Sequence, residues 1–193
     1  MNIVNLFPQA VLETQLENWD QCREEIFKQV ELSSGDIELP KNNIVLANNS
    51  FISANILKKC LITTAQLNAN LQQYTDTIGV ESLKICDSWV SKYEYNEYLS
   101  THRHSPKHVS GVIFLTDGFQ GGDFYFENPV VDLDHILLNE HYAKFNSYNE
   151  PLHVIKPIMG KLIIFRSLLS HGTTPLSSNT IRYSLAFNAM VGK

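Results

Sequence analysis

The sequence is poor in the features that mark three common classes of protein. Its 15 lysines and arginines are outnumbered by 20 aspartates and glutamates, and the longest basic run is Lys58-Lys59. A groove for nucleic acid needs clustered basic side chains, so we expect no nucleic-acid partner. No window approaches the roughly 18 apolar residues of a membrane span, and the first residues lack the basic segment of an export signal. We therefore expect neither membrane insertion nor export.

Cysteine is scarce as well. Cys22, Cys60 and Cys86 are odd in number, far apart and without a CxxC spacing. This pattern argues against a disulfide framework and favours a reducing compartment. We expect a cytoplasmic protein.

Apolar residues, in contrast, make up 44% of the 193 residues, which is enough for a substantial core. We expect a single domain over residues 1–193, in which residues 1–80 form a helical support and residues 81–193 form the core of the molecule. Within the support, apolar residues at helical spacing predict helices over residues 14–32 and 52–74.

After Gly79 the sequence changes character. Short segments rich in β-branched and aromatic residues alternate with Gly, Pro, Asp and Asn, which predicts antiparallel strands without helices between them. The expected fold is mostly β with N-terminal helices (α+β), built on an antiparallel sandwich or jelly-roll core. The strand segments are LKICDSWVSKYEY, HVSGVIFL, GGDFYFENP, HVIKPIMGKLIIF and IRYSLAFNAM. Residues 130–151 interrupt this rhythm and are expected to form an insertion near one mouth of the sandwich, either a mobile lid or a static excursion.

Three of the seven histidines fall within the seven residues HRHSPKH. His102 and His104 are two apart, so at a strand entrance both point to the same face and can contact one ion. His171, just after the apolar strand KLIIF, is the candidate third ligand. An HxH pair alone is weak evidence, and each histidine can also be ordinary surface polarity. His108 is too far along the chain to join the pair, and we expect the remaining three, His135, His141 and His153, to be solvated.

The segment IRYSLAFN places Arg182, Ser184 and Asn188 on one face of a strand and apolar side chains on the other. An arginine that points into an apolar interior is costly unless it meets an anion. Arg182 is therefore a candidate carboxylate-binding residue one strand away from the histidines, although an edge-strand charge is the simpler alternative.

Taken in order, the HxH pair and the segments SGVIFL, GGDFYFENP, IMGKLIIFRSLLSHGTTP and RYSLAFN resemble the iron(II)- and 2-oxoglutarate-dependent oxygenases. Within them, the chain is similar to small bacterial and phage members related to the prolyl hydroxylases. The resemblance covers residues 85–190 and implies a double-stranded β-helix catalytic core preceded by supporting helices. It also implies Fe(II), molecular oxygen and 2-oxoglutarate as cosubstrate, with substrate oxidation coupled to decarboxylation of 2-oxoglutarate to succinate. The substrate would be a protein side chain such as proline, or a small metabolite.

Residue by residue, the resemblance makes His102 the first iron ligand and His171 the distal one. His104 occupies the position at which most relatives carry aspartate, so the expected ligand set is three histidines. Asp117, Asp123 and Glu127 are alternative sources of a carboxylate, but none has the two-residue offset of His104.

The resemblance also assigns the cosubstrate. Arg182 matches the residue that binds the far carboxylate of 2-oxoglutarate, with help from the hydroxyl of Ser184, and Tyr93 lies where relatives place a cosubstrate-binding tyrosine. Two other functions stay open. One is a cupin-type dioxygenase that uses three histidines and no oxoacid, which has no need of a buried Arg182. The other is a non-catalytic jelly-roll binding module.

Overall fold

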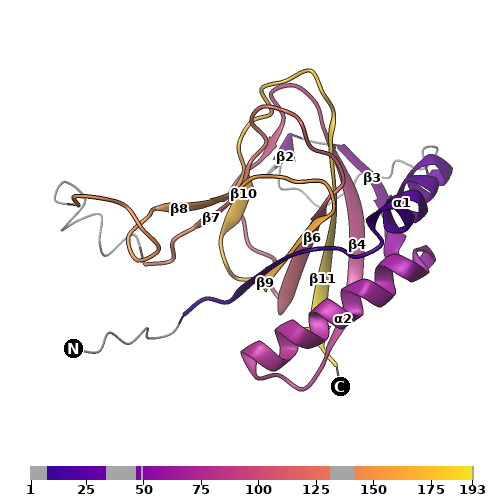
Figure 1. Ribbon diagram of the computed structural model, residues 1–193, viewed down its shortest axis with the longest axis horizontal. Coiled ribbons are helices and arrows are strands. Elements are labelled where there is room, and N and C mark those ends of the chain that lie inside the picture. The colour runs from indigo at the N-terminus through magenta and orange to yellow at the C-terminus, as the bar shows by residue number, and fades with distance from the viewer. Residues whose placement is uncertain (1–7, 34–46, 49, 131–141, 193) are drawn as a thin grey trace.

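The computed structural model describes residues 8–33, 47–48, 50–130 and 142–192. Its backbone forms two facing antiparallel sheets and two helices that cover one side (Figure 1). The large sheet has the order β1-β9-β6-β11-β4-β3 and the small sheet the order β10-β7-β8. The strands of the large sheet are β1 (Val11–Gln15), β3 (Ser50–Ala54), β4 (Leu83–Tyr93), β6 (Val109–Phe114), β9 (Lys161–Arg166) and β11 (Arg182–Val191). Those of the small sheet are β7 (Phe124–Glu127), β8 (Leu152–Ile155) and β10 (His171–Thr173), and β2 (Ala47–Asn48) pairs with β5 (Tyr98–Leu99).

The helices pack against the outer face of the large sheet (Figure 1). They are α1 (Trp19–Ser33) and α2 (Leu61–Ile78), with the short 3-10 helix η1 (Ile56–Lys59) before α2. Odd-numbered residues of β11, such as Leu185 and Phe187, join this outer core, because successive side chains of a strand point to opposite faces. A second core, in which phenylalanines and aliphatic residues are equally numerous, fills the space between the two sheets. The candidate site residues His171, Arg182 and Ser184 are buried polar side chains beside this second core. Among the described helices, none is long and apolar enough to cross a membrane.

The N-terminal third differs from the predicted all-helical support. The helix predicted over residues 14–32 begins only at Trp19, because Val11–Gln15 pairs with residues 161–165 of β9 as an edge strand. The helix predicted over residues 52–74 begins at Leu61 and ends at Ile78, where Gly79 adopts a left-handed conformation with φ of 73°. Residues 50–54 instead form β3 beside β4. In both cases pairing with a distant strand outweighs the local helical spacing.

The predicted strands after residue 80 are confirmed, with one subdivision. The segment HVIKPIMGKLIIF contains two strands, β8 and β9, separated by a turn in which Gly160 has φ of 81°. The sequence predicts an insertion over residues 130–151. Residues 131–141 of it lie outside the described residues, so the structure does not test whether this segment is a lid. His135 and His141 lie in the same part.

Candidate metal and oxoacid site

Two of the candidate ligands are held side by side by the backbone. His102 and His171 exchange both backbone hydrogen bonds, N–H to O at 2.9 and 3.1 Å, in an isolated antiparallel bridge. The peptide N–H of His104 donates to the carbonyl of Ser167, at 2.8 Å. His102 and His104 thus lie after β5 and before β6 rather than within a strand, but their side chains still converge.

The three imidazoles form one cluster, in which one ring nitrogen from each lies within 4.8 Å of the others. The Nε2 atoms of His102 and His104 are 2.8 Å apart. The rings of His102 and His171 have centroids 4.3 Å apart, and those of His104 and His171 are 5.0 Å apart. This is the only such group of potential ligands among the described residues, and it contains no carboxylate.

Hydrogen bonds at the other ring nitrogen set the tautomer of each histidine. Nδ1 of His102 lies 2.9 Å from the carbonyl of Ser100, and Nδ1 of His171 lies 2.8 Å from the carbonyl of Leu169. Nδ1 of His104 lies 2.7 Å from the side-chain oxygen of Asn188. Because a carbonyl only accepts, each Nδ1 carries the proton, and each Nε2 turns a lone pair toward the centre of the cluster. Lone pairs this close repel one another unless a cation lies between them, so the cluster fits a metal ion.

The electrostatics agree with this donor set. Burial lowers the pKa of His102 to about 4 and that of His171 to about 3, and it lowers the pKa of His104 as well. All three imidazoles are therefore neutral near pH 7, which is the form that binds metal. Imidazole suits iron but also nickel, copper and zinc.

This burial predicts that the metal-free protein loses stability in mild acid. In the unfolded chain the imidazoles take up protons near their ordinary pKa of 6.5, whereas His102 and His171 resist protonation until about pH 4 or below. Because the unfolded state binds more protons below pH 6.5, the stability contribution is complete above 6.5 and is lost as pH falls toward 4. We expect a lower urea midpoint at about pH 5 than at about pH 7.5.

The matched control for this prediction is a double variant, His102→Gln with His171→Gln. It should show a flatter dependence on pH over the same range. Equal slopes for the two proteins would contradict this account.

Arg182 is the second unusual group. Its side chain is only 1% exposed, and its Nε and Nη1 atoms have no hydrogen-bond partner among the described residues. Its guanidinium carbon lies 4.4 Å from the ring centre of Tyr93 and 5.9 Å from that of Phe114. Burial lowers the pKa of Arg182, although the nearby Tyr93 and Asp123 oppose that shift. A buried guanidinium with unused donors fits an anion, and a carboxylate matches its planar fork.

Strand β11 connects the two groups. Arg182, Ser184 and Asn188 are all buried, and the even-numbered positions of β11 face the small sheet, as the alternation predicts. Asn188 contacts His104 at one end of this row, and Arg182 lies at the other end, opposite Tyr93 on β4. Ser184 lies between them, opposite Phe114 on β6. Arg182, Ser184 and Asn188 therefore line one interior face of β11, and the histidine cluster meets one end of it through His104.

None of the described residues that the sequence left as alternatives belongs to the histidine cluster. His108 is exposed, and its Nδ1 accepts from the backbone N–H of Val191. The three alternative carboxylates pair with other groups, although Thr101, the partner of Glu127, directly precedes His102. Asp117 accepts from the N–H of Met159, Asp123 pairs with Lys156 at 2.5 Å, and Glu127 accepts from Thr101. His153 is exposed and pairs with Glu150.

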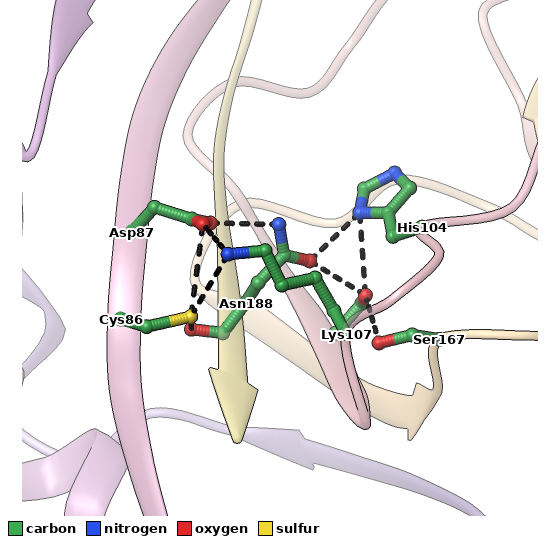
Figure 2. A network of polar contacts seen from close by, with 7 residues as sticks. Cys86, Asp87, His104, Lys107, Ser167 and Asn188 are labelled. Atoms are coloured by element: carbon green, nitrogen blue, oxygen red, sulfur yellow. Dashed lines mark hydrogen bonds and ion pairs between the residues drawn. The ribbon is translucent and has the colours of Figure 1, made fainter.

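Sequence reasoning missed two parts of the surroundings. Aromatic rings flank His171, with Phe165 at 4.7 Å and Phe124 at 5.6 Å between ring centres, so that side of the cluster is apolar. The other part is a polar network behind His104, in which Asn188, Asp87 and two serines take part (Figure 2). Asn188 shares the face of Arg182 in the strand pattern, which was the available signal, but nothing local pairs it with Asp87.

Comparisons with known proteins agree with this geometry. The family model described as "Putative 2OG-Fe(II) oxygenase" matches residues 87–188, which include all six candidate site residues. No curated protein is significantly similar in sequence.

Among solved structures, a prolyl-4-hydroxylase from Pseudomonas putida has a TM-score of 0.62 at 15% identity, covering 95% of this chain and 94% of that one. The non-heme alpha-ketoglutarate-dependent carbocyclase SnoK from nogalamycin biosynthesis has a TM-score of 0.66 at 12% identity, covering 94% and 79%. A 2OG-Fe(II) oxygenase family oxidoreductase from Burkholderia pseudomallei has a TM-score of 0.51 at 16% identity; the match covers 70% of this chain but spans only 59% of that one. The predicted double-stranded β-helix fold is confirmed.

Proposed function

The chain belongs to the 2OG-Fe(II) oxygenase family, and we propose that His102, His104 and His171 hold its iron while Arg182 holds the far carboxylate of 2-oxoglutarate. The protein is an oxidoreductase that uses Fe(II), 2-oxoglutarate and molecular oxygen, as its family does. One observation carries the assignment: three imidazoles, of which His171 is buried and His102 and His104 are half-buried, gather at one end of an interior face of β11 whose other end carries a buried guanidinium with two unused donors.

Bound iron would activate oxygen for the oxidation of the substrate while 2-oxoglutarate is decarboxylated to succinate. The residues of the chain supply position and environment. The fixed Nδ1–H groups hold the three imidazoles in the orientation and tautomer that a metal needs. Arg182, with the hydroxyl of Ser184 and the ring of Tyr93 beside it, would fix the length and register of the oxoacid. The aromatic rings around His171 keep water from that side.

The substrate class is a finer proposal. We propose a hydroxylase that acts on a protein side chain such as proline, or on a small metabolite. The similarity in fold to a prolyl-4-hydroxylase supports the first choice, and the similarity to a carbocyclase of a biosynthetic pathway keeps the second.

One observation argues against each of the two alternative functions. A three-histidine dioxygenase without an oxoacid gives no reason for a desolvated guanidinium at Arg182 with two unused donors. A non-catalytic binding module gives no reason for three ring nitrogens gathered within 4.8 Å of one another. Both observations therefore favour the oxoacid-dependent enzyme.

The direct test is succinate formation from 2-oxoglutarate with added Fe(II), with and without candidate proline-containing peptides. Turnover that depends on both iron and oxoacid would support the proposal, and a peptide that stimulates it would identify the substrate class. Metal binding without any oxoacid turnover, under every condition tried, would favour the three-histidine alternative.

Two further expectations remain proposals. We propose one domain over residues 1–193, with residues 1–80 as support and residues 81–193 as the catalytic core. The outer core that α1 and α2 share with the large sheet supports a single domain. We also propose a cytoplasmic location, in line with three free cysteines, Cys22, Cys60 and Cys86.

A further inference from the structure

In the hydrogen-bond network behind His104, the chemistry of the side chains determines which group donates and which accepts. Asn188, only 5% exposed, donates from Nδ2 to the carboxylate of Asp87 at 2.7 Å. Its Oδ1 accepts from the hydroxyl of Ser110 at 2.7 Å and from Nδ1 of His104 at 2.7 Å (Figure 2). The amide therefore stands between a carboxylate on one side and an imidazole on the other.

Asp87 decides which way this amide faces. An ionised carboxylate can only accept, so the Asn188 NH2 group must face Asp87 and its oxygen must face His104. That oxygen in turn requires the proton of His104 to be on Nδ1. Nε2 is then unprotonated and has a free lone pair for a metal ion. The charge of Asp87 thus sets the tautomer of a ring that it does not touch.

The local fold brings Asp87 into this position through a bulge. On β11, Asn188 and Ala189 are consecutive, but their partners on β4 are Asp87 and Ile85, so Cys86 is an extra residue. The bulge changes the phase of β4: Ile85 faces the outer core, and Asp87 faces the same side as Asn188. Lys107, which follows His104 in the chain, forms an ion pair with Asp87 at 2.5 Å and donates to Cys86 at 3.4 Å.

We infer that Asp87 and Asn188 are positioning residues that hold the tautomer and orientation of His104 for metal binding, an inference that rests on the proposed function. His104 is neutral where most relatives carry an aspartate, and Asp87 supplies a carboxylate two hydrogen bonds behind the ring. Partners of this kind, behind a metal ligand, typically change metal affinity 10- to 100-fold when removed.

The first readout is the tautomer itself, measured by long-range 1H–15N NMR of the imidazoles in the metal-free protein. The signals of His104 are assigned by their loss in His104→Gln. In the unmodified protein we expect the Nδ1–H form. In Asp87→Asn, which preserves shape, the new amide can donate as well as accept, so Asn188 can flip and a mixture with the Nε2–H form is expected.

Two further variants separate this role from a merely structural one. Lys107→Met breaks the surface ion pair but leaves the contact between Asp87 and Asn188, so the Nδ1–H form should persist. The exchange Asp87→Asn with Asn188→Asp places the carboxylate beside His104 and the amide behind it, and should restore the Nδ1–H form. A loss of packing alone would not be repaired by this exchange.

The second readout is affinity for Fe(II) under anaerobic conditions, or for Co(II) as a substitute. It should fall about tenfold or more in Asp87→Asn and recover in the exchanged double variant. An unchanged tautomer in Asp87→Asn overturns the inference, whatever the metal result. An altered tautomer with unchanged metal affinity overturns the role in metal binding. If the unmodified protein binds no metal, the proposed function fails separately, and the tautomer measurement still decides whether Asp87 orients His104.

Discussion

Replacing His104 with alanine is expected to lower the affinity for Fe(II) by more than about a hundredfold, because even the loss of a partner behind a ligand costs 10- to 100-fold. The variant removes one of three convergent Nε2 atoms and leaves Asn188 without its imidazole partner. The measurement is anaerobic titration with Fe(II), or metal content after equilibration. His108→Ala is the matched control, since His108 is exposed and lies outside the cluster. The affinity of this variant for Fe(II) should equal that of the unmodified protein.

A second substitution at the same position tests the ligand assignment from the other direction. His104→Asp rebuilds the two-histidine, one-carboxylate set that is commoner among non-heme iron oxygenases, and should restore most of the metal binding lost in the alanine variant. Turnover will differ, since the charge at the iron changes. Full metal content in His104→Ala would remove His104 from the ligand set and direct attention to Asp117, Asp123 and Glu127.

The second large effect concerns Arg182. Arg182→Met should raise the concentration of 2-oxoglutarate needed for half-maximal turnover about tenfold or more, because a hydrogen bond to a charged group contributes roughly 1.5–3 kcal/mol. Iron binding should stay near normal. The same substitution should raise the melting temperature of the ligand-free protein, since it replaces a buried cation with two unused donors by an apolar side chain of similar length.

These two results must appear together. Arg23→Met, at an exposed position on α1 where the guanidinium lies over Phe27, is the control for the loss of one positive charge. A stabilised variant with an unchanged oxoacid requirement would show that Arg182 does not bind the cosubstrate. A destabilised variant would show that the guanidinium has partners that contribute to the fold.

The part of the site that could be predicted from sequence is the part in which local spacing determines geometry. Alternation along β11 was sufficient to place Arg182, Ser184 and Asn188 on one face. The two-residue spacing of His102 and His104 predicted that their rings converge, and they do, although both lie in a loop held by bonds to His171 and Ser167. The role of each ligand candidate came from the order of motifs along the chain. Those features survive because they depend on the backbone within a few residues.

The remainder depends on pairings between distant segments. No local pattern indicates that Val11–Gln15 extends β9, and the helical spacing nearby points the other way. Asp87 was not selected, because its inward direction depends on a bulge that exists only where β4 meets β11. Simple alternation along β4 gives no sign of that change of phase.

The contacts around the histidines join segments far apart in the chain, and this affects when the site forms during folding. His102 is bonded to His171 through the backbone, and His104 reaches Asn188, 84 positions later in the chain. Contacts between distant segments form late in folding, because the long intervening loop must first be ordered. During synthesis the HxH pair emerges well before its third histidine and before the amide that orients it. A nascent chain therefore presents only two unoriented rings, and the proposed metal site is complete only after β11 has closed the large sheet between β6 and β4.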